Sequence, residues 1–117
     1  MPRSARTLPP TSMTEAELLD NTVELGHLLG WHAAHFRPAR TAHGWKTPVG
    51  YDGKGWPDLC LTRERVVFIE AKSASGRLSP EQEAWRDWLT AAGAEWHLFT
   101  PSDWLDGSIE AVLRRRS

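Results

Sequence analysis

The side chains in this sequence best suited to catalysis are two carboxylates and a lysine. Asp58 begins one apolar segment (58–61), and Glu70 and Lys72 stand at the end of another (66–71) and directly after it. The composition of both segments predicts β-strands. Because successive side chains of a strand point to opposite faces, Glu70 and Lys72 share one face, and the apolar positions between them point to the core.

The turn between the two predicted strands decides which residues face each other. A three-residue turn at 63–65 would pair Thr62 with Val66 and bring Asp58 directly opposite Glu70. Directly opposed residues have Cβ atoms about 4.5–5.5 Å apart. A two-residue turn would move Asp58 by one position and onto the wrong face.

Two carboxylates this close repel each other, so the pair needs a shared proton, a cation or strong hydrogen bonds. A hard divalent cation is the natural partner, and Mg²⁺ takes one or two carboxylates together with phosphate oxygens. Lys72 on the same face could orient or deprotonate a metal-bound water, or stabilise charge on a phosphate. The set therefore suits hydrolysis of a phosphodiester. The alternative is a surface ion-pair cluster of little energetic value.

Asp58, Glu70 and Lys72 belong to two short motifs, and a third motif follows them in the chain. They are GWPDL at 55–59, EAK at 70–72 and RLSPEQEAW at 77–85. Together they resemble the VRR-NUC (virus-type replication-repair nuclease) family of the PD-(D/E)XK nucleases, and the resemblance runs from about Thr14 to about Trp104. It implies an α/β fold with a restriction-endonuclease-like αβββαβ core, in which helices flank a central mixed sheet. It also implies a Mg²⁺- or Mn²⁺-dependent endodeoxyribonuclease.

The resemblance assigns a role to each matching residue. Asp58 and Glu70 would be metal ligands, with the backbone carbonyl of Ala71 as a third. Lys72 would be the catalytic lysine, and Gln82 an accessory residue of the active site. Gln82 is also the third residue of a predicted helix that starts after a serine, so a helix cap alone would explain it; both roles can hold.

An acidic residue of the first helix often completes such sites, and here Glu15 and Glu17 are the candidates. Residues 14–29 have the apolar spacing of an amphipathic helix. If Ser12 caps this helix, Glu15 belongs to the capping box; if Thr14 caps it, Glu17 does and Glu15 is free. Glu15 is preferred as a catalytic residue because it lies on the face expected to pack toward the sheet.

The small stand-alone members of this family occur in phages and bacteria and are thought to act as homodimers on branched DNA, notably four-way junctions. The resemblance therefore implies DNA as a partner and a resolvase-like homodimer. Two alternatives stay open: a flap or nicking nuclease of phage DNA processing, and a non-catalytic DNA-binding module that retains the fold. A protein-interaction domain without a nucleic-acid role is a third.

The remaining elements must position these residues. The sequence predicts a strand at 31–37, a long loop at 38–55, a helix from Ser79 to about 92, a strand at 96–99 and a last helix that starts at Ser102 or Ser108. The order favours a mixed sheet with helices on its faces.

The loop at 38–55 combines basic side chains with Trp45 and Tyr51, and Trp56 follows it. Such a mixture suits phosphate contact and base stacking, although a dimer interface would explain it nearly as well. The predicted DNA contacts are Arg37, Arg40, Lys46, Lys54 and Arg77.

The composition sets the outer limits. A length of 117 residues suits one domain, predicted at 13–117 after a flexible arm at 1–12. The net charge of −1 is low for a nucleic-acid binder, so DNA contacts must come from local patches. A single cysteine, Cys60, excludes a disulfide framework, and the histidine spacing matches no tight zinc site. No apolar run suits a membrane helix or a signal peptide. We therefore expect no membrane partner, and we expect a cytoplasmic location in a bacterial or phage-infected cell.

Overall fold

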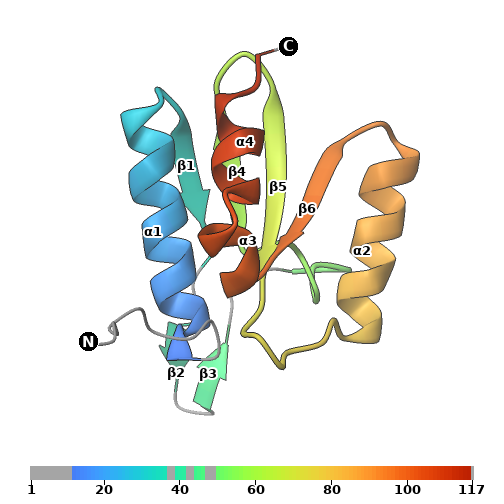
Figure 1. The fold of residues 1–117 in the computed structure, drawn as a ribbon. Helices are drawn as coiled ribbons and strands as arrows, with labels where there is room; N and C mark the ends of the chain where they lie inside the picture. The colour runs from blue at the N-terminus through green and yellow to red at the C-terminus, as the bar shows by residue number, and fades with distance from the viewer. Residues whose placement is uncertain (1–11, 37–38, 42–43, 47–49, 117) are drawn as a thin grey trace.

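The computed structural model describes residues 12–36, 39–41, 44–46 and 50–116, without the side chains of 39–41 and 44–46. The predicted arm at 1–12 lies outside these ranges except for Ser12. The chain is an α/β fold in which helices flank a mixed sheet (Figure 1). Within the described ranges, no helix combines the length and apolar character needed to cross a bilayer.

The main sheet has four strands in the order β1-β4-β5-β6. Neighbouring strands are antiparallel except for β5 and β6, which are parallel and joined through α2. The strands of this sheet are β1 (His32–His35), β4 (Leu59–Thr62), β5 (Val66–Ala71) and β6 (Glu95–Phe99), and the helices are α1 (Glu15–Leu28), α2 (Pro80–Ala91), α3 (Pro101–Leu105) and α4 (Ser108–Arg114).

The prediction of a structureless loop at 38–55 was wrong. The segment contains a separate hairpin of β2 (Ala39–Thr41) and β3 (Gly44–Lys46), which pair antiparallel across a two-residue connection. Strands of three residues are too short to leave an alternating apolar pattern, and the surrounding glycines and prolines favour a loop reading. The hairpin lies beyond the end of the main sheet at which β5 finishes (Figure 1).

The last helix, α4, starts at Ser108, one of the two predicted starts, but the separate short helix α3 before it was not predicted. Gly107 stands between them with a φ of 85°, a left-handed backbone conformation that ends the first helix. Thr100 is the N-cap residue of α3, and Ser108 is the first residue of α4. The proposed start at Ser102 therefore lies inside α3.

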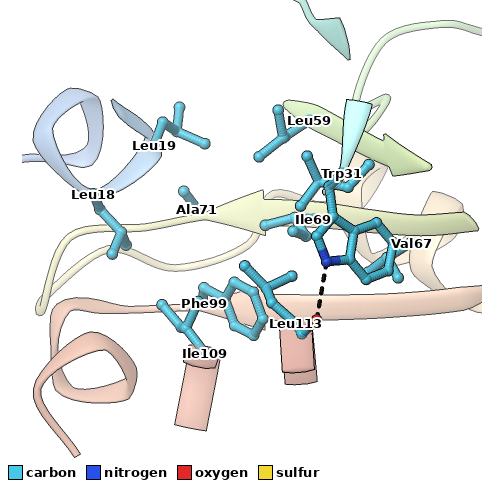
Figure 2. Packing of buried hydrophobic residues seen from close by; sticks show 11 residues of the cluster. Leu18, Leu19, Trp31, Leu59, Val67, Ile69, Ala71, Phe99, Ile109 and Leu113 are labelled. Carbon is cyan, nitrogen blue, oxygen red and sulfur yellow. Dashed lines mark hydrogen bonds between the residues drawn. The ribbon is translucent and has the colours of Figure 1, made fainter. Parts of the chain in front are cut away.

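The hydrophobic core lies between one face of the sheet and the helices α1 and α4 (Figure 2). Apolar side chains at alternate positions of β4 and β5 supply the sheet side, as the period-two pattern predicts. The buried hydrophobic residues are Leu18, Leu19, Trp31, Leu59, Leu61, Val67, Ile69, Ala71, Phe99, Ile109 and Leu113. The opposite face of β5 carries Phe68, whose ring packs against that of Trp56, and then Glu70.

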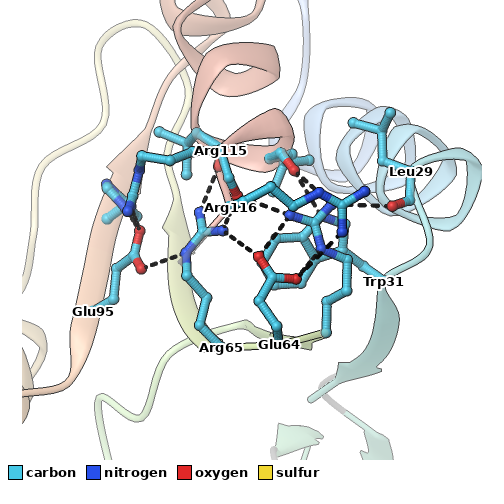
Figure 3. Close-up of polar contacts among 11 residues, drawn as sticks. Leu29, Trp31, Glu64, Arg65, Glu95, Arg115 and Arg116 are labelled. Atoms are coloured by element: carbon cyan, nitrogen blue, oxygen red, sulfur yellow. Dashed lines mark hydrogen bonds and ion pairs between the residues drawn. The ribbon is translucent and has the colours of Figure 1, made fainter.

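The β4–β5 turn is tied to the C-terminal end of α4 by two arginines (Figure 3). The guanidinium groups of Arg63 and Arg65 lie 4.5 and 4.9 Å from the centroid of the Trp31 ring. Arg63 also donates to the carbonyl of Leu113 at 3.1 Å, and the Trp31 indole N–H donates to the same carbonyl at 2.9 Å. These contacts satisfy helix-end carbonyls that have no partner inside the helix. They hold the turn that sets the register of the two central strands.

Candidate active site

The register of β4 and β5 is the one that a three-residue turn predicts. Thr62 pairs with Val66, and Leu59 pairs with Ile69 at the other end of the ladder. Asp58 directly precedes Leu59, so the continued register sets it opposite Glu70. The predicted register is confirmed, and the Asp58 carboxylate is close enough to act on that of Glu70.

The Asp58 side chain is fixed by the backbone of β5. Its Oδ2 atom accepts a hydrogen bond from the backbone N–H of Ala71 at 3.0 Å. In the continued register the residue opposite Ala71 is Pro57, which has no N–H to donate. A ladder hydrogen bond from that position therefore cannot reach the Ala71 carbonyl.

Glu70 is almost fully buried, with 2 % of its surface exposed. Burial, the hydrogen bond with Asp58 and the negative charge of Asp58 together raise the pKa of Glu70 to about 9, although Lys72 acts to lower it. At neutral pH the pair therefore holds a proton in the absence of a cation. A proton in this position is what a pair of close carboxylates requires when no metal neutralises it.

Gln82 links this pair to the start of α2. Its side-chain Oε1 accepts from the backbone N–H of Ser79 at 2.9 Å, and the Ser79 hydroxyl accepts from the Gln82 backbone N–H at 3.1 Å. The Gln82 amide nitrogen then donates to Oε2 of Glu70 at 2.8 Å. One side chain thus both caps the helix and contacts Glu70 of the acidic pair.

The first helix resolves the choice between the two capping boxes. Thr14 is the N-cap residue, and its backbone N–H donates to the Glu17 carboxylate at 2.9 Å. Glu15 is exposed and takes no part in this box, and its charge contributes to the raised pKa of Glu70. Glu15 thus lies near the pair, whereas Glu17 is engaged by the cap.

An oxygen-only donor set fits a hard divalent cation. Asp58, Glu70 and the carbonyl of Ala71 would supply such a set, and the Ala71 backbone and the Asp58 carboxylate are already joined by a hydrogen bond. The described residues contain no group of three or more His, Cys, Asp and Glu side chains placed to hold a metal. The acidic part of the site is therefore the pair itself, with Glu15 at its margin.

Sequence reasoning missed what holds Asp58 in place. Gly55 has a φ of 89°, and a Cβ atom there would lie 2.5 Å from the backbone carbon of Glu81 in α2. The segment before Asp58 therefore rests directly on α2 at a position where only glycine fits. The ring of Trp56 meets that of Trp85, which also belongs to α2, edge to face at 4.9 Å, and this second contact holds the same segment against the same helix. The GWPD and RLSPEQEAW motifs mark the two segments as important, but the sequence does not show that these segments contact each other.

The predicted DNA contacts are only partly placed. Lys54 is exposed and lies 3.8 Å from the Glu81 carboxylate, and Arg77 is exposed between β5 and α2. Arg37 lies outside the described residues. Arg40 and Lys46 belong to β2 and β3, but their side chains lie outside the described part of the chain.

Comparison with known proteins gives one family. The pattern that defines the VRR-NUC domain matches residues 14–100. A solved structure described as a VRR_NUC domain superimposes with a TM-score of 0.62 at 20 % sequence identity, covering 85 % of this chain and 97 % of that one. At that identity the likeness shows the fold. No curated protein matches.

Proposed function

The chain belongs to the VRR-NUC family of nuclease domains, and from this premise we propose that it is a metal-dependent endodeoxyribonuclease. Its substrate would be structured or branched DNA, with a four-way junction first, and its cofactor Mg²⁺ or Mn²⁺. The observation that carries the proposal is the pair of carboxylates of Asp58 and Glu70, aligned by the strand register and fixed by hydrogen bonds from Ala71 and Gln82.

In this proposal Asp58, Glu70 and the Ala71 carbonyl would hold the ion. When bound, the ion supplies a Lewis acid that stabilises negative charge on the phosphate and lowers the pKa of the attacking water. Glu70 would hold the ion in its ionised form, because a carboxylate ligand must be deprotonated. Gln82 keeps the Glu70 carboxylate in place through its amide nitrogen.

Lys72 follows β5 directly and is close enough to Glu70 for its charge to act on that carboxylate. Its ammonium group can orient the water or donate to a phosphoryl oxygen in which charge builds up. Glu15 would shape the margin of the site. A homodimer would place two such sites on two strands of a junction, as symmetric dimers do readily.

The test is a cleavage assay on a labelled four-way junction, a flap and a linear duplex, each with Mg²⁺, Mn²⁺ or EDTA. Asp58→Asn and Lys72→Met should each lose more than about 100-fold in cutting rate while DNA binding in Ca²⁺ persists. The matched control is Asp87→Asn, which changes an exposed aspartate of α2 with 67 % of its side chain accessible.

The substrate panel also separates the alternatives. Preferential cutting of the flap or nicking of the duplex would replace the junction as the substrate. Binding without any cutting would favour a DNA-binding module. Metal-dependent cutting that survives both active-site substitutions would contradict the assignment of these residues.

A further inference from the structure

An apolar pocket of about 490 Å³ is lined in part by Trp56, two residues before Asp58, and the proposed chemistry does not use it. The volume lies within the range of small-molecule sites. Its lining is mostly aromatic and consists of Phe36, Tyr51, Trp56 and Trp85, together with Gly50, Asp52 and Gly53. A lining with so little charge suits the flat face of a ring rather than a phosphate group.

The floor of the pocket is rigid. The ring of Trp56 makes edge-to-face contacts with those of Phe36 at 6.1 Å, Phe68 at 5.5 Å and Trp85 at 4.9 Å. The Trp85 indole N–H donates to the backbone carbonyl of Asp52 at 2.9 Å, which ties the 50–56 loop to α2. Rings held in this way lose little freedom when another ring packs against them.

Tyr51 forms the wall of this pocket on the loop side, and its backbone is strained. Its φ of 56° is left-handed, an uncommon conformation for a residue with a side chain. Its ring is nevertheless fully exposed, so burial does not offset the strain. Hydrogen bonds from Gly53 to Gly50 and from Trp56 to Gly53 close the turns that hold the ring outward. Strain of this kind is concentrated at ligand-binding positions.

The pocket and the acidic pair share backbone. Trp56 stands two residues before Asp58, and the Phe36 N–H donates to the Asp58 carbonyl at 2.9 Å. Trp85 lies three residues after Gln82 in α2. A DNA strand whose phosphodiester lies at the carboxylates would therefore have its neighbouring bases beside the pocket.

We propose that this pocket receives one unpaired nucleobase of the DNA strand that is cut, with Tyr51 stacked on its face. The proposal rests on the proposed nuclease function and adds a feature of the substrate to it. A paired base stays in the duplex stack, so the pocket would select DNA with an unpaired base next to the cleaved bond. Stacking on an aromatic side chain tolerates any base, since every base has a π face.

The experiment compares two flap substrates of equal length, one with thymine bases along the single-stranded arm and one with abasic sites there. Binding is measured by fluorescence anisotropy in Ca²⁺, and cleavage separately in Mg²⁺. The wild type should bind the thymine flap about 5- to 150-fold more tightly than the abasic flap. Tyr51→Ala should abolish this ratio, and Tyr51→Phe should keep it.

The matched control is Leu28→Ala, which removes an apolar side chain that is 79 % exposed at the far end of α1. It should leave the binding ratio unchanged. Equal binding of both flaps by the wild type would overturn the proposal, as would an unchanged ratio in Tyr51→Ala or a ratio lost in Leu28→Ala. A partner protein seated in the pocket would give the first of these results.

The two readouts separate this proposal from the nuclease proposal. Cleavage without a preference for the thymine flap would refute the pocket and retain the nuclease. A preference in binding without cleavage in Mg²⁺ would retain the pocket and refute the nuclease. Failure to bind either flap would refute the pocket.

Discussion

Replacing Glu70 by Gln should make the metal-free protein more stable at neutral pH while removing its response to metal. The Glu70 carboxyl titrates with a pKa of about 9 in the folded chain, against an ordinary value of 4.5. Glutamine reproduces the protonated form, because its amide can donate to Asp58 and accept from Gln82. The variant therefore keeps the hydrogen bonds of the pair without the cost of taking up a proton on folding at neutral pH.

The sign and size of the effect follow from proton linkage. The folded chain binds this proton more tightly than the unfolded chain, so the contribution of Glu70 to stability is complete below pH 4.5 and declines as the pH rises toward 9. Between pH 4.5 and pH 7 the decline amounts to about 3 kcal/mol. For a domain of this size that corresponds to more than about 10 °C in Tm.

The assay is urea denaturation of the wild type and Glu70→Gln between pH 4.5 and pH 8, with EDTA and then with Mg²⁺. Only the difference between the two proteins is used, so groups that titrate in both cancel. In EDTA the variant should gain about 3 kcal/mol on the wild type from pH 4.5 to pH 7. At pH 8, Mg²⁺ should stabilise the wild type alone.

Glu110→Gln serves as the matched control, because Glu110 is an exposed carboxylate of α4 paired with Arg114. Its free energy of unfolding should differ from that of the wild type by an amount that changes little with pH. A difference between wild type and Glu70→Gln that stays constant over this range would refute the raised pKa. Equal stabilisation of both proteins by Mg²⁺ would refute the role of Glu70 as a ligand.

Two further predictions concern the framework of the site, and both are checked by the denaturation midpoint in urea. Gly55→Ala should lower the free energy of unfolding by at least about 3 kcal/mol or prevent folding, because the new Cβ would meet the Glu81 backbone. The control Gly93→Ala, at a similar φ of 87° but in open space, should lower it by about 1 kcal/mol. Equal losses would contradict the packing argument. Trp31→Phe should cost about 1–3 kcal/mol because the Leu113 carbonyl loses its indole donor, and an unchanged midpoint would show that Arg63 alone satisfies it.

The acidic pair could be predicted because it depends on local geometry. The turn at 63–65 fixes the register, and the register fixes the partner of Glu70 at a distance of only twelve residues. Alternation along 66–71 then decides which face each side chain takes. No knowledge of the remaining chain enters this argument.

The choice between Glu15 and Glu17 could not be made in this way. Ser12 and Thr14 both precede a glutamate by three residues, so the capping pattern occurs twice. The hydrogen bonds of Thr14 select one of them. Two other contacts also join segments that are far apart in sequence, and no local pattern reveals them. They are the packing of Gly55 against α2 and the hydrogen bond from Trp85 to the 50–56 loop.

The capping box of α2 has a consequence for which residue can occupy its third position. Glutamate and glutamine serve equally as caps, since either offers an oxygen to the backbone N–H of Ser79. Only glutamine has a second end of opposite polarity, and here that end faces Glu70. A glutamate at position 82 would preserve the helix yet set a third carboxylate against the pair, so an exchange that is silent for the helix would disturb the site. The oxygen and the nitrogen of one side-chain amide thus fix the orientation of α2 relative to the carboxylates. The first turn of this helix therefore contacts the acidic pair directly instead of only supporting the sheet.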